Sequence, residues 1–147
     1  EIQRDYQGQT IVLLGVLKGA FLFCADLARS IQMPCRIEFV QASSYKHQKT
    51  STGTVHLSAP PELRDQHVVI VEDILDTGLT LHEILKHLRE LKPSSLEVCT
   101  LLRKAIPRDV EITPRYVGFD IPNRFVVGYG LDYAERYREV PEIRCLD

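Results

Sequence analysis

Apolar runs alternate with amphipathic stretches along the whole chain. Residues 10–14 and 67–71 are mostly β-branched or aliphatic, which is typical of strands buried on both faces of a parallel sheet. Residues 20–30 and 81–91 place apolar side chains three and four positions apart, which predicts amphipathic helices. Further strands are expected at 36–42, 54–57, 97–102, 116–119 and 124–129. This alternation predicts an α/β domain whose mostly parallel sheet is flanked by helices.

Size and composition fit one globular unit. The chain has 147 residues, of which 44% are hydrophobic and 26% charged, so it is long enough to bury a sizeable core. We expect a single domain over residues 1–147. The first residues read as the tail of a helix ending at Gln7-Gly8, and the chain begins at Glu1; we expect that the rest of this N-terminal helix is truncated.

The segment that follows the strand at 67–71 carries the most chemical information. Residues 72–80 read E-D-I-L-D-T-G-L-T, so three carboxylates precede a turn rich in hydroxyl groups. Ligands of open α/β sheets lie beyond the carboxyl ends of the strands, and the N–H groups at a helix start bind phosphate. Because carboxylates repel phosphate, they should bind sugar hydroxyls instead. The pattern therefore predicts a site for a phosphorylated ribose, with a divalent cation to offset the remaining repulsion.

Residues 68–80 resemble the phosphoribosyl diphosphate (PRPP) motif of the type I phosphoribosyltransferases. The pattern is closest to the hypoxanthine-guanine phosphoribosyltransferase family, and its Leu79-Thr80 ending is similar to that of bacterial members. The likeness extends from Ile11 to Leu146 and includes separate motifs at 15–19, 43–45, 101–108 and 117–139. It implies the type I fold, a mostly parallel twisted sheet with a small hood, formed largely by residues 103–147, and a flexible lid loop at 43–53.

The resemblance also implies how the PRPP motif binds its substrate. Glu72 and Asp73 would hold the ribose hydroxyls, and Asp76 would manage the proton on purine N7 as general acid or base. The remaining substrate-binding positions of this segment are Ile74, Leu75, Thr77, Gly78, Leu79 and Thr80. The last four of them would cradle the 5′-phosphate through N–H groups and hydroxyls.

The leaving pyrophosphate is implied to contact two other parts of the chain. Lys18 and Gly19 would lie beside it, after a cis Leu17-Lys18 peptide, and Ser44 and Tyr45 would close over it as part of the lid. Taken alone, residues 15–19 also fit an ordinary turn with a solvated lysine, and residues 43–53 a disordered connection.

The resemblance also implies two basic residues and a magnesium site near the phosphates. Arg138 matches a pyrophosphate contact of the family, and Arg108 matches a supporting basic residue. Mg2+ is the expected cofactor, with Glu72, Asp73 and Asp132 as the positions implied for it.

The purine would bind to residues in the last third of the chain. Lys104 matches the donor to the oxygen at purine C6; a lysine has three donors and no acceptor, so it favours a 6-oxo base over adenine. Phe125 would stack on the ring, and the backbone of Val126 would read its pyrimidine edge. Without the resemblance, Phe125 is more readily explained as a core residue.

The reaction implied is transfer of the 5-phosphoribosyl group from PRPP to N9 of hypoxanthine or guanine, which gives IMP or GMP and pyrophosphate in purine salvage. Four cysteines without a C-x-x-C pair suit a cytoplasmic protein, and the family is oligomeric, which implies a homodimer or homotetramer. Alternatives are a non-catalytic regulator that binds nucleotide and nucleic acid, a transferase for adenine, uracil or orotate, and a purely structural module. The net charge of -2 gives the regulator little support, and no apolar run is long enough for a membrane span.

Overall fold

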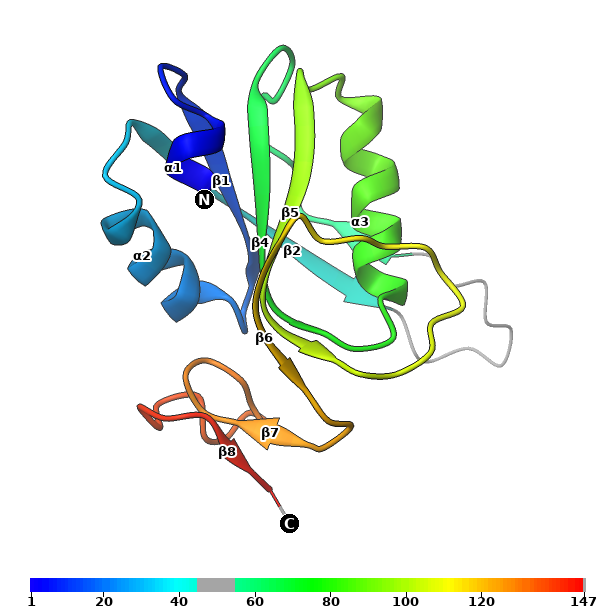
Figure 1. Cartoon of the computed structure of the whole chain (residues 1–147). Coiled ribbons are helices and arrows are strands. Elements are labelled where there is room, and N and C mark those ends of the chain that lie inside the picture. Colours follow the sequence, from blue (N-terminus) through cyan, green and yellow to red (C-terminus); the bar gives the residue numbers. More distant parts are fainter. Residues whose placement is uncertain (45–54, 147) are drawn as a thin grey trace.

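The fold is a twisted six-stranded sheet between helices (Figure 1), and the computed structural model describes residues 1–44 and 55–146. The order across the sheet is β3-β2-β1-β4-β5-β6. Its strands are β1 (Ile11–Leu17), β2 (Cys35–Ser44), β3 (Val55–Leu57), β4 (His67–Leu75), β5 (Ser95–Lys104) and β6 (Tyr116–Ile121). All neighbouring strands are parallel except β2 and β3. The predicted α/β fold with a mostly parallel sheet is therefore confirmed.

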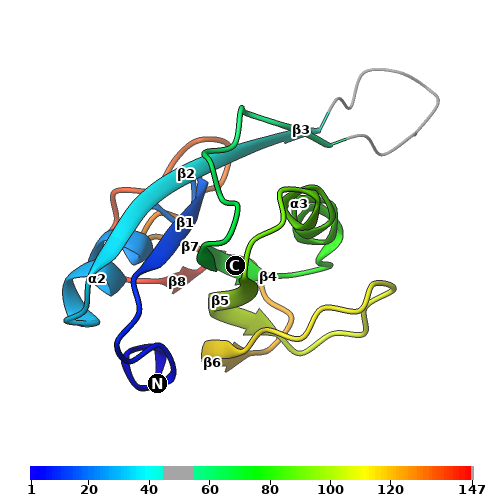
Figure 2. The same ribbon diagram turned by 90° about the horizontal axis from the view of Figure 1, so that it is seen from above.

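Helices cover both faces of this sheet. α1 (Ile2–Asp5) and α2 (Phe21–Ser30) lie on one face, and α3 (Leu79–Glu90) lies on the other (Figures 1 and 2). α3, the longest helix in the described ranges, has 12 residues, and none of the helices there could span a membrane. The two predicted helices are confirmed, and α3 begins two residues before the predicted start at Leu81.

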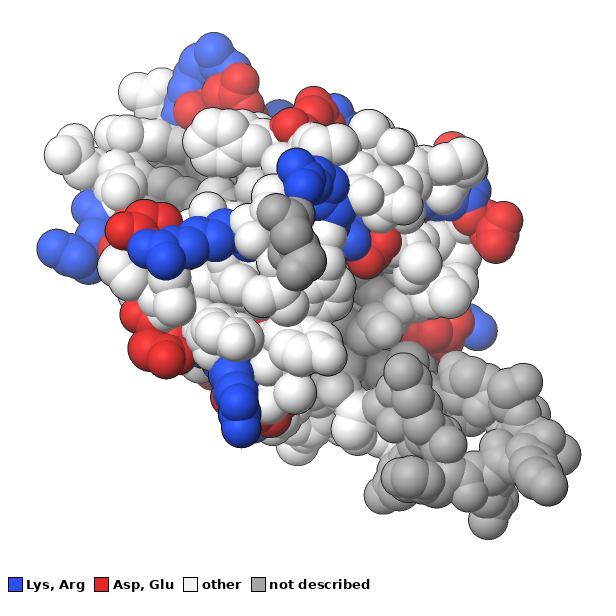
Figure 3. Space-filling view, turned by 90° about the horizontal axis from the view of Figure 1, so that it is seen from below, with Lys and Arg blue, Asp and Glu red and all other residues white. Residues whose placement is uncertain are grey.

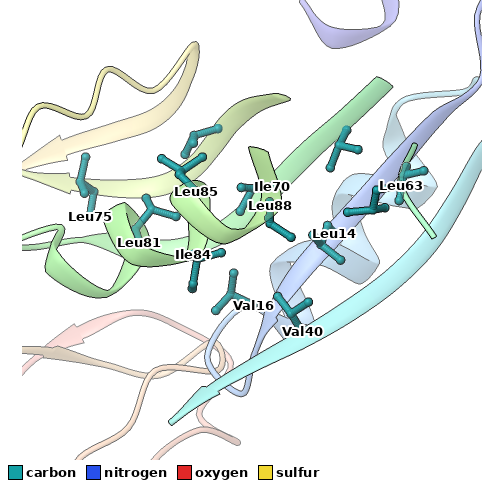
Figure 4. Packing of buried hydrophobic residues seen from close by; sticks show 13 residues of the cluster. Leu14, Val16, Val40, Leu63, Ile70, Leu75, Leu81, Ile84, Leu85 and Leu88 are labelled. Atoms are coloured by element: carbon teal, nitrogen blue, oxygen red, sulfur yellow. The ribbon is translucent and has the colours of Figure 1, made fainter. Parts of the chain in front are cut away.

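Alternate residues of the central strands pack into two separate cores. Val68 and Ile70 of β4 face α3, whereas Val69 and Val71 face α2. Figure 4 shows the core under α3, which includes Leu14, Val40, Leu63, Ile70, Leu81, Ile84, Leu85 and Leu88. Full burial of each such aliphatic side chain contributes about 1.5–3 kcal/mol. The two cores fix the register of β1 and β4. They therefore also determine toward which face of the sheet each later residue of these strands points.

Three central strands extend past their predicted ends. The strands are predicted to end at residues 14, 71 and 102, but β1 ends at Leu17, β4 at Leu75 and β5 at Lys104. The ladder between β4 and β5 continues through the pairs 72–100, 74–102 and 75–103, so backbone hydrogen bonding carries the strands on after the hydrophobic pattern stops. The carboxylates at 72 and 73 therefore lie on a strand, not in a turn after it.

The C-terminal residues form a small hood beneath the carboxyl edge of the sheet (Figure 1). It contains a two-stranded sheet of β7 (Val126–Val127) and β8 (Arg144–Cys145). The strand predicted at 124–129 is thus only two residues long, because the chain turns sharply at Gly128 and Gly130, both with φ of +96°. A Cβ at Gly130 would lie 2.4 Å from the carbonyl oxygen of Gly19, so this turn packs closely on the connection between β1 and α2.

Candidate active site

Two neighbouring hollows open at the carboxyl edge of the sheet. The first, which we name the β4–α3 hollow, has a volume of about 240 Å³ and is lined by the continuous segment 74–81 together with Glu72, the end of β1 and Ala42. The second, the hood hollow, has a volume of about 150 Å³. Its lining residues are Asp73, Ile74, Asp76, Lys104, Phe125, Val126, Leu131 and Asp132. Ile74 and Asp76 line both hollows, which therefore meet at the end of β4.

The β4–α3 hollow is built around the start of α3. Gly78 has φ of +81° and precedes the first residue of the helix, a backbone conformation that glycine adopts without a steric penalty. Thr77 and Thr80 are exposed beside it. The first N–H groups of a helix have no partner within the helix, so this turn offers donors that suit a phosphate monoester. The four residues predicted to cradle the phosphate lie together here.

Glu72 and Asp73 divide between the two hollows. Successive strand residues point to opposite faces, and accordingly Glu72 lines the β4–α3 hollow and Asp73 the hood hollow. The N–H of Asp73 donates to Glu72 Oε1 at 3.2 Å, and the N–H of Ile74 donates to Asp73 Oδ1 at 2.8 Å. Burial, together with the adjacent charge of Asp73, raises the pKa of Glu72 well above its usual value. Hydroxyl donors or a cation bound beside Glu72 and Asp73 would stabilise the charged form of the two carboxylates.

The turn after β1 contacts the same carboxylates. A Cβ at Gly19 would lie only 1.9 Å from Asp73 Oδ2, so Gly19 is the residue type that this close approach requires. The peptide between Leu17 and Lys18 is cis, as the resemblance implies. The sequence motif at 15–19 is thus brought against the PRPP motif.

Asp76 and Lys104 form an ion pair where the hollows meet. Lys104 Nζ donates to Asp76 Oδ2 at 3.0 Å. The side chain of Lys104 is only 9% exposed, whereas that of Asp76 is 49% exposed. The lysine is therefore held at the end of β5, while its partner carboxylate remains accessible to a ligand.

The ring of Phe125 forms part of the wall of the hood hollow. Phe125 is 50% exposed, and its ring meets that of Tyr133 edge to face with 5.7 Å between the centroids. The alternative of Phe125 as a core residue is therefore wrong. An exposed ring beside a hollow is suited to stacking on a planar base.

Lys18 and Arg138 converge on Glu135, a residue to which the sequence motifs assign no role. Lys18 Nζ lies 3.1 Å from Glu135 Oε2, and Arg138 Nη2 lies 3.3 Å from Glu135 Oε1. Arg138 also lies 3.5 Å from Asp132 and donates to the carbonyl of Gly130 at 2.7 Å. The two cations expected at the pyrophosphate thus lie close together, and the carboxylate of Glu135 contacts both of them.

Lys18, Gly19, Arg108 and Arg138 are not among the residues that line the two hollows. Arg108 donates to main-chain carbonyl groups. Ser44 ends β2, and Tyr45 lies outside the described residues, as does most of the predicted lid. The lid therefore stays a prediction.

Comparisons with known proteins show the family of this chain. The profile of the phosphoribosyl transferase domain family matches residues 1–134. A hypoxanthine-guanine phosphoribosyltransferase of Mycobacterium avium is 49% identical over 142 residues, which are 95% of this chain and 70% of that protein. A hypoxanthine phosphoribosyltransferase of Salmonella typhimurium is 44% identical over 138 residues, which are 92% of this chain and 78% of that protein.

A solved structure gives the same result in three dimensions. The crystal structure of a hypoxanthine-guanine phosphoribosyltransferase from Bacillus anthracis superposes with a TM-score of 0.92 at 47% identity, and it covers 99% of this chain and 87% of that one. Sequence and fold agree over nearly the full chain. This protein therefore belongs to the phosphoribosyltransferase family, and within it to the hypoxanthine-guanine phosphoribosyltransferases with the type I fold.

Proposed function

We propose that this chain transfers the 5-phosphoribosyl group of PRPP to N9 of hypoxanthine or guanine, and so forms IMP or GMP in purine salvage. The observation that carries the proposal is the Asp76–Lys104 pair, with its 3.0 Å contact at the junction of the two hollows. One hollow offers amides and hydroxyls suited to a phosphate, and the other offers an exposed ring suited to a base. A pair at the junction of the two is well placed to act where sugar and base join.

In this proposal the β4–α3 hollow holds the phosphorylated ribose. The amides and hydroxyls of Thr77–Thr80 bind the 5′-phosphate, as at other helix starts. Glu72 and Asp73 accept hydrogen bonds from the ribose hydroxyls, so the carboxylates face neutral donors while the phosphate lies at the amides. The anomeric carbon then lies near Asp76, at the opening to the hood hollow.

The hood hollow holds the purine. Lys104 donates to the oxygen at C6, Phe125 stacks on the ring, and the Val126 backbone reads the pyrimidine edge. Asp76 takes or returns the N7 proton as general base or acid. In the structure Lys104 already donates to Asp76. The purine would therefore bind next to an ion pair that has no net charge.

Enzymes of this family generally act with a divalent metal ion bound with PRPP, and we propose Mg2+. Asp73 and Asp132 line the hood hollow, and Glu72, which precedes Asp73, lines the β4–α3 hollow. Hard carboxylate oxygens suited to Mg2+ are therefore present on both sides of the junction. The described residues hold no group of three His, Cys, Asp or Glu side chains around one point, which fits an ion that takes most of its ligands from substrate and water. Such an ion would neutralise the pyrophosphate and improve it as a leaving group.

Lys18 and Arg138 bind the pyrophosphate in this proposal, and Ser44 and Tyr45 close over it. Glu135 now bridges both cations. Its carboxylate must therefore give way when PRPP binds, because two anions would otherwise compete for the same donors. Displacement is inexpensive, since the side chain is 65% exposed and exposed ion pairs contribute about 0–1 kcal/mol.

The alternative functions explain the site less well. A nucleic-acid-binding regulator needs a basic face, yet in the view from the hood end Lys and Arg are interspersed with Asp and Glu (Figure 3). An adenine transferase needs an acceptor for the 6-amino group, whereas Lys104 has donors alone. A purely structural role does not explain why the exposed ring of Phe125 lies beside a buried lysine.

The test is an assay with purified protein, PRPP, Mg2+ and one free base at a time. We expect nucleotide and pyrophosphate with hypoxanthine or guanine, and none with adenine, uracil or orotate. Loss of product when Mg2+ is removed by a chelator, and its recovery with added Mg2+, tests the cofactor. Absence of product with every 6-oxopurine would contradict the proposed function.

A cytoplasmic location and a homodimeric or homotetrameric assembly complete the proposal. All four cysteines are free in the structure, which suits a reducing compartment. Sedimentation equilibrium of the purified protein distinguishes monomer, dimer and tetramer.

A further inference from the structure

Arg108 binds the backbone of both segments that supply the ion pair. Its Nε donates to the carbonyl of Asp76 at 2.8 Å, and its Nη2 donates to the carbonyls of Leu75 at 3.2 Å and Lys104 at 2.6 Å. Leu75 and Asp76 are at the end of β4, and Lys104 is the last residue of β5. One half-buried guanidinium thus spans the two strand ends that carry the reacting pair.

The segment that carries Arg108 is itself fixed to the core. Residues 105–115, between β5 and β6, pass beside the start of α3 (Figure 1). Side chains of Val110 and Ile112 come within 3.3 Å and 3.0 Å of the position that a Cβ would take at Gly78. Ile112 also packs against the core under α3. The backbone that carries Arg108 is therefore held in place by packing against the core.

We propose that Arg108 is a positioning residue, which keeps Asp76 and Lys104 in register for the purine without touching it. This inference rests on the proposed function. The Asp76–Lys104 contact joins residues 28 positions apart, and parallel-ladder pairing between β4 and β5 ends at Leu75 and Arg103. Beyond that pair, Arg108 supplies bridging hydrogen bonds in place of the ladder.

An arginine is the side chain that this task requires. Its planar fork presents five donors in fixed directions, whereas lysine has a single nitrogen on a flexible stem. A lysine at position 108 could reach one carbonyl, but it could not hold the two strand ends at a fixed spacing. A shift of about 1 Å in a reacting group can lower the rate by about 100-fold.

The experiment is a double-mutant cycle on IMP affinity, measured by calorimetry so that no turnover is needed. The proteins are wild type, Arg108→Gln, Lys104→Met and the double variant, with Arg108→Lys as the conservative change. Arg103→Gln is the matched control, because Arg103 is exposed, pairs with Asp120 at 2.6 Å and lines neither hollow.

We expect Arg108→Gln to weaken IMP binding by about 10-fold in the wild-type background and by less than about 3-fold in the Lys104→Met background, because Lys104, the positioned side chain that donates to the 6-oxo group, is then absent. Arg108→Lys should restore part of the affinity. Ribose 5-phosphate, which lacks the base, should bind all the variants within about 3-fold of wild type. Arg103→Gln should match wild type.

An equal loss in both backgrounds, or an equal loss for ribose 5-phosphate, would overturn the positioning role and indicate general destabilisation. If Arg108→Gln does not fold, the same cycle with Arg108→Lys decides between the two outcomes. Failure of the proposed function would look different. Wild type itself would then not bind IMP, or Lys104→Met would bind it as well as wild type does.

Discussion

The two hollows at the sheet edge are built in opposite ways. Most of the wall of the β4–α3 hollow is the continuous segment 74–81, where a strand end, a turn and a helix start follow one another. The hood hollow instead draws on separate segments, around residues 73–76, 104, 125–126 and 131–132. Local structure therefore shapes the first hollow, and long-range packing shapes the second.

This difference predicts two kinds of defect. Changes in the β4–α3 hollow should affect the binding of PRPP, because its donors contact the unreactive phosphate equally before and during the reaction. Changes in the hood hollow should affect turnover and the choice of base, because its groups act on the atoms that change. The variants below test that division.

Asp76→Asn should have the largest effect. An amide cannot exchange the N7 proton, so we expect kcat to fall by about 100- to 10,000-fold, while KM for PRPP changes little. Steady-state kinetics with both substrates varied measures this split. Glu90→Gln, at the far end of α3, removes one charge of the same sign as a control. A normal kcat in Asp76→Asn would remove this residue as the proton carrier.

Lys104→Met should come next. Methionine keeps the length of the buried stem but removes the donor to the 6-oxo group, and loss of a charged hydrogen bond in a buried site costs about 3 kcal/mol. We expect kcat/KM for hypoxanthine to fall by about 100-fold and KM for PRPP to change less than about 3-fold. An equal loss for both substrates would show that the hollows are not separable at this residue.

Gly19→Ala tests the link between the hollows. The new Cβ would lie 1.9 Å from Asp73 Oδ2, so either the carboxylate or the turn after β1 must move. We expect KM for PRPP to rise by about 10-fold or more, equivalent to a binding loss of at least about 1.4 kcal/mol. Gly8→Ala is the matched control, because a Cβ there meets nothing within 4 Å; its φ of +78° is expected to lower only the melting temperature. An unchanged KM in Gly19→Ala would mean that Asp73 does not hold the ribose.

Thr80→Ala should have a moderate effect confined to PRPP. The hydroxyl is one donor among several amides, so its removal should raise KM for PRPP by about 10-fold or less. We expect KM for hypoxanthine to stay near the wild-type value. Calorimetry with ribose 5-phosphate checks the loss without turnover, and an equal loss of affinity for the free base would contradict the division.

Glu135→Gln should have the smallest effect, and in the opposite direction. The amide removes the charge that competes for Lys18 and Arg138, so KM for PRPP should fall by about 2- to 3-fold, as expected for an exposed ion pair. Glu142→Gln, which disrupts an exposed pair with Arg144, serves as control. A higher KM in Glu135→Gln would mean that Glu135 assists binding.

The sequence predicts the two regions unequally well. The helix start at Gly78 follows from local chemistry, because a glycine and two threonines after a buried strand leave few other structures. The same local reasoning misplaces the ends of β1, β4 and β5, since backbone pairing continues through the glycine or charged residues at which the strands are predicted to stop. The placement of Glu72 and Asp73 on opposite faces follows from that longer strand.

Other features depend on distances that no local pattern contains. Lys18 and Glu135 are 117 positions apart, and the motif at 117–139 assigns no role to Glu135. The resemblance assigns Arg108 only a supporting basic role near the phosphates, whereas its partners in the structure are backbone carbonyls. The short strand β8 is not predicted, because two residues carry no periodicity.

The most direct test of the two-hollow account is a crystal structure of the complex with IMP. The account predicts the 5′-phosphate within hydrogen-bond distance, about 3 Å, of the amides at residues 77–80. It also predicts the purine against Phe125, with its 6-oxo group bonded to Lys104 Nζ. A phosphate bound at Lys18 and Arg138, or a base lying outside the hood hollow, would contradict it.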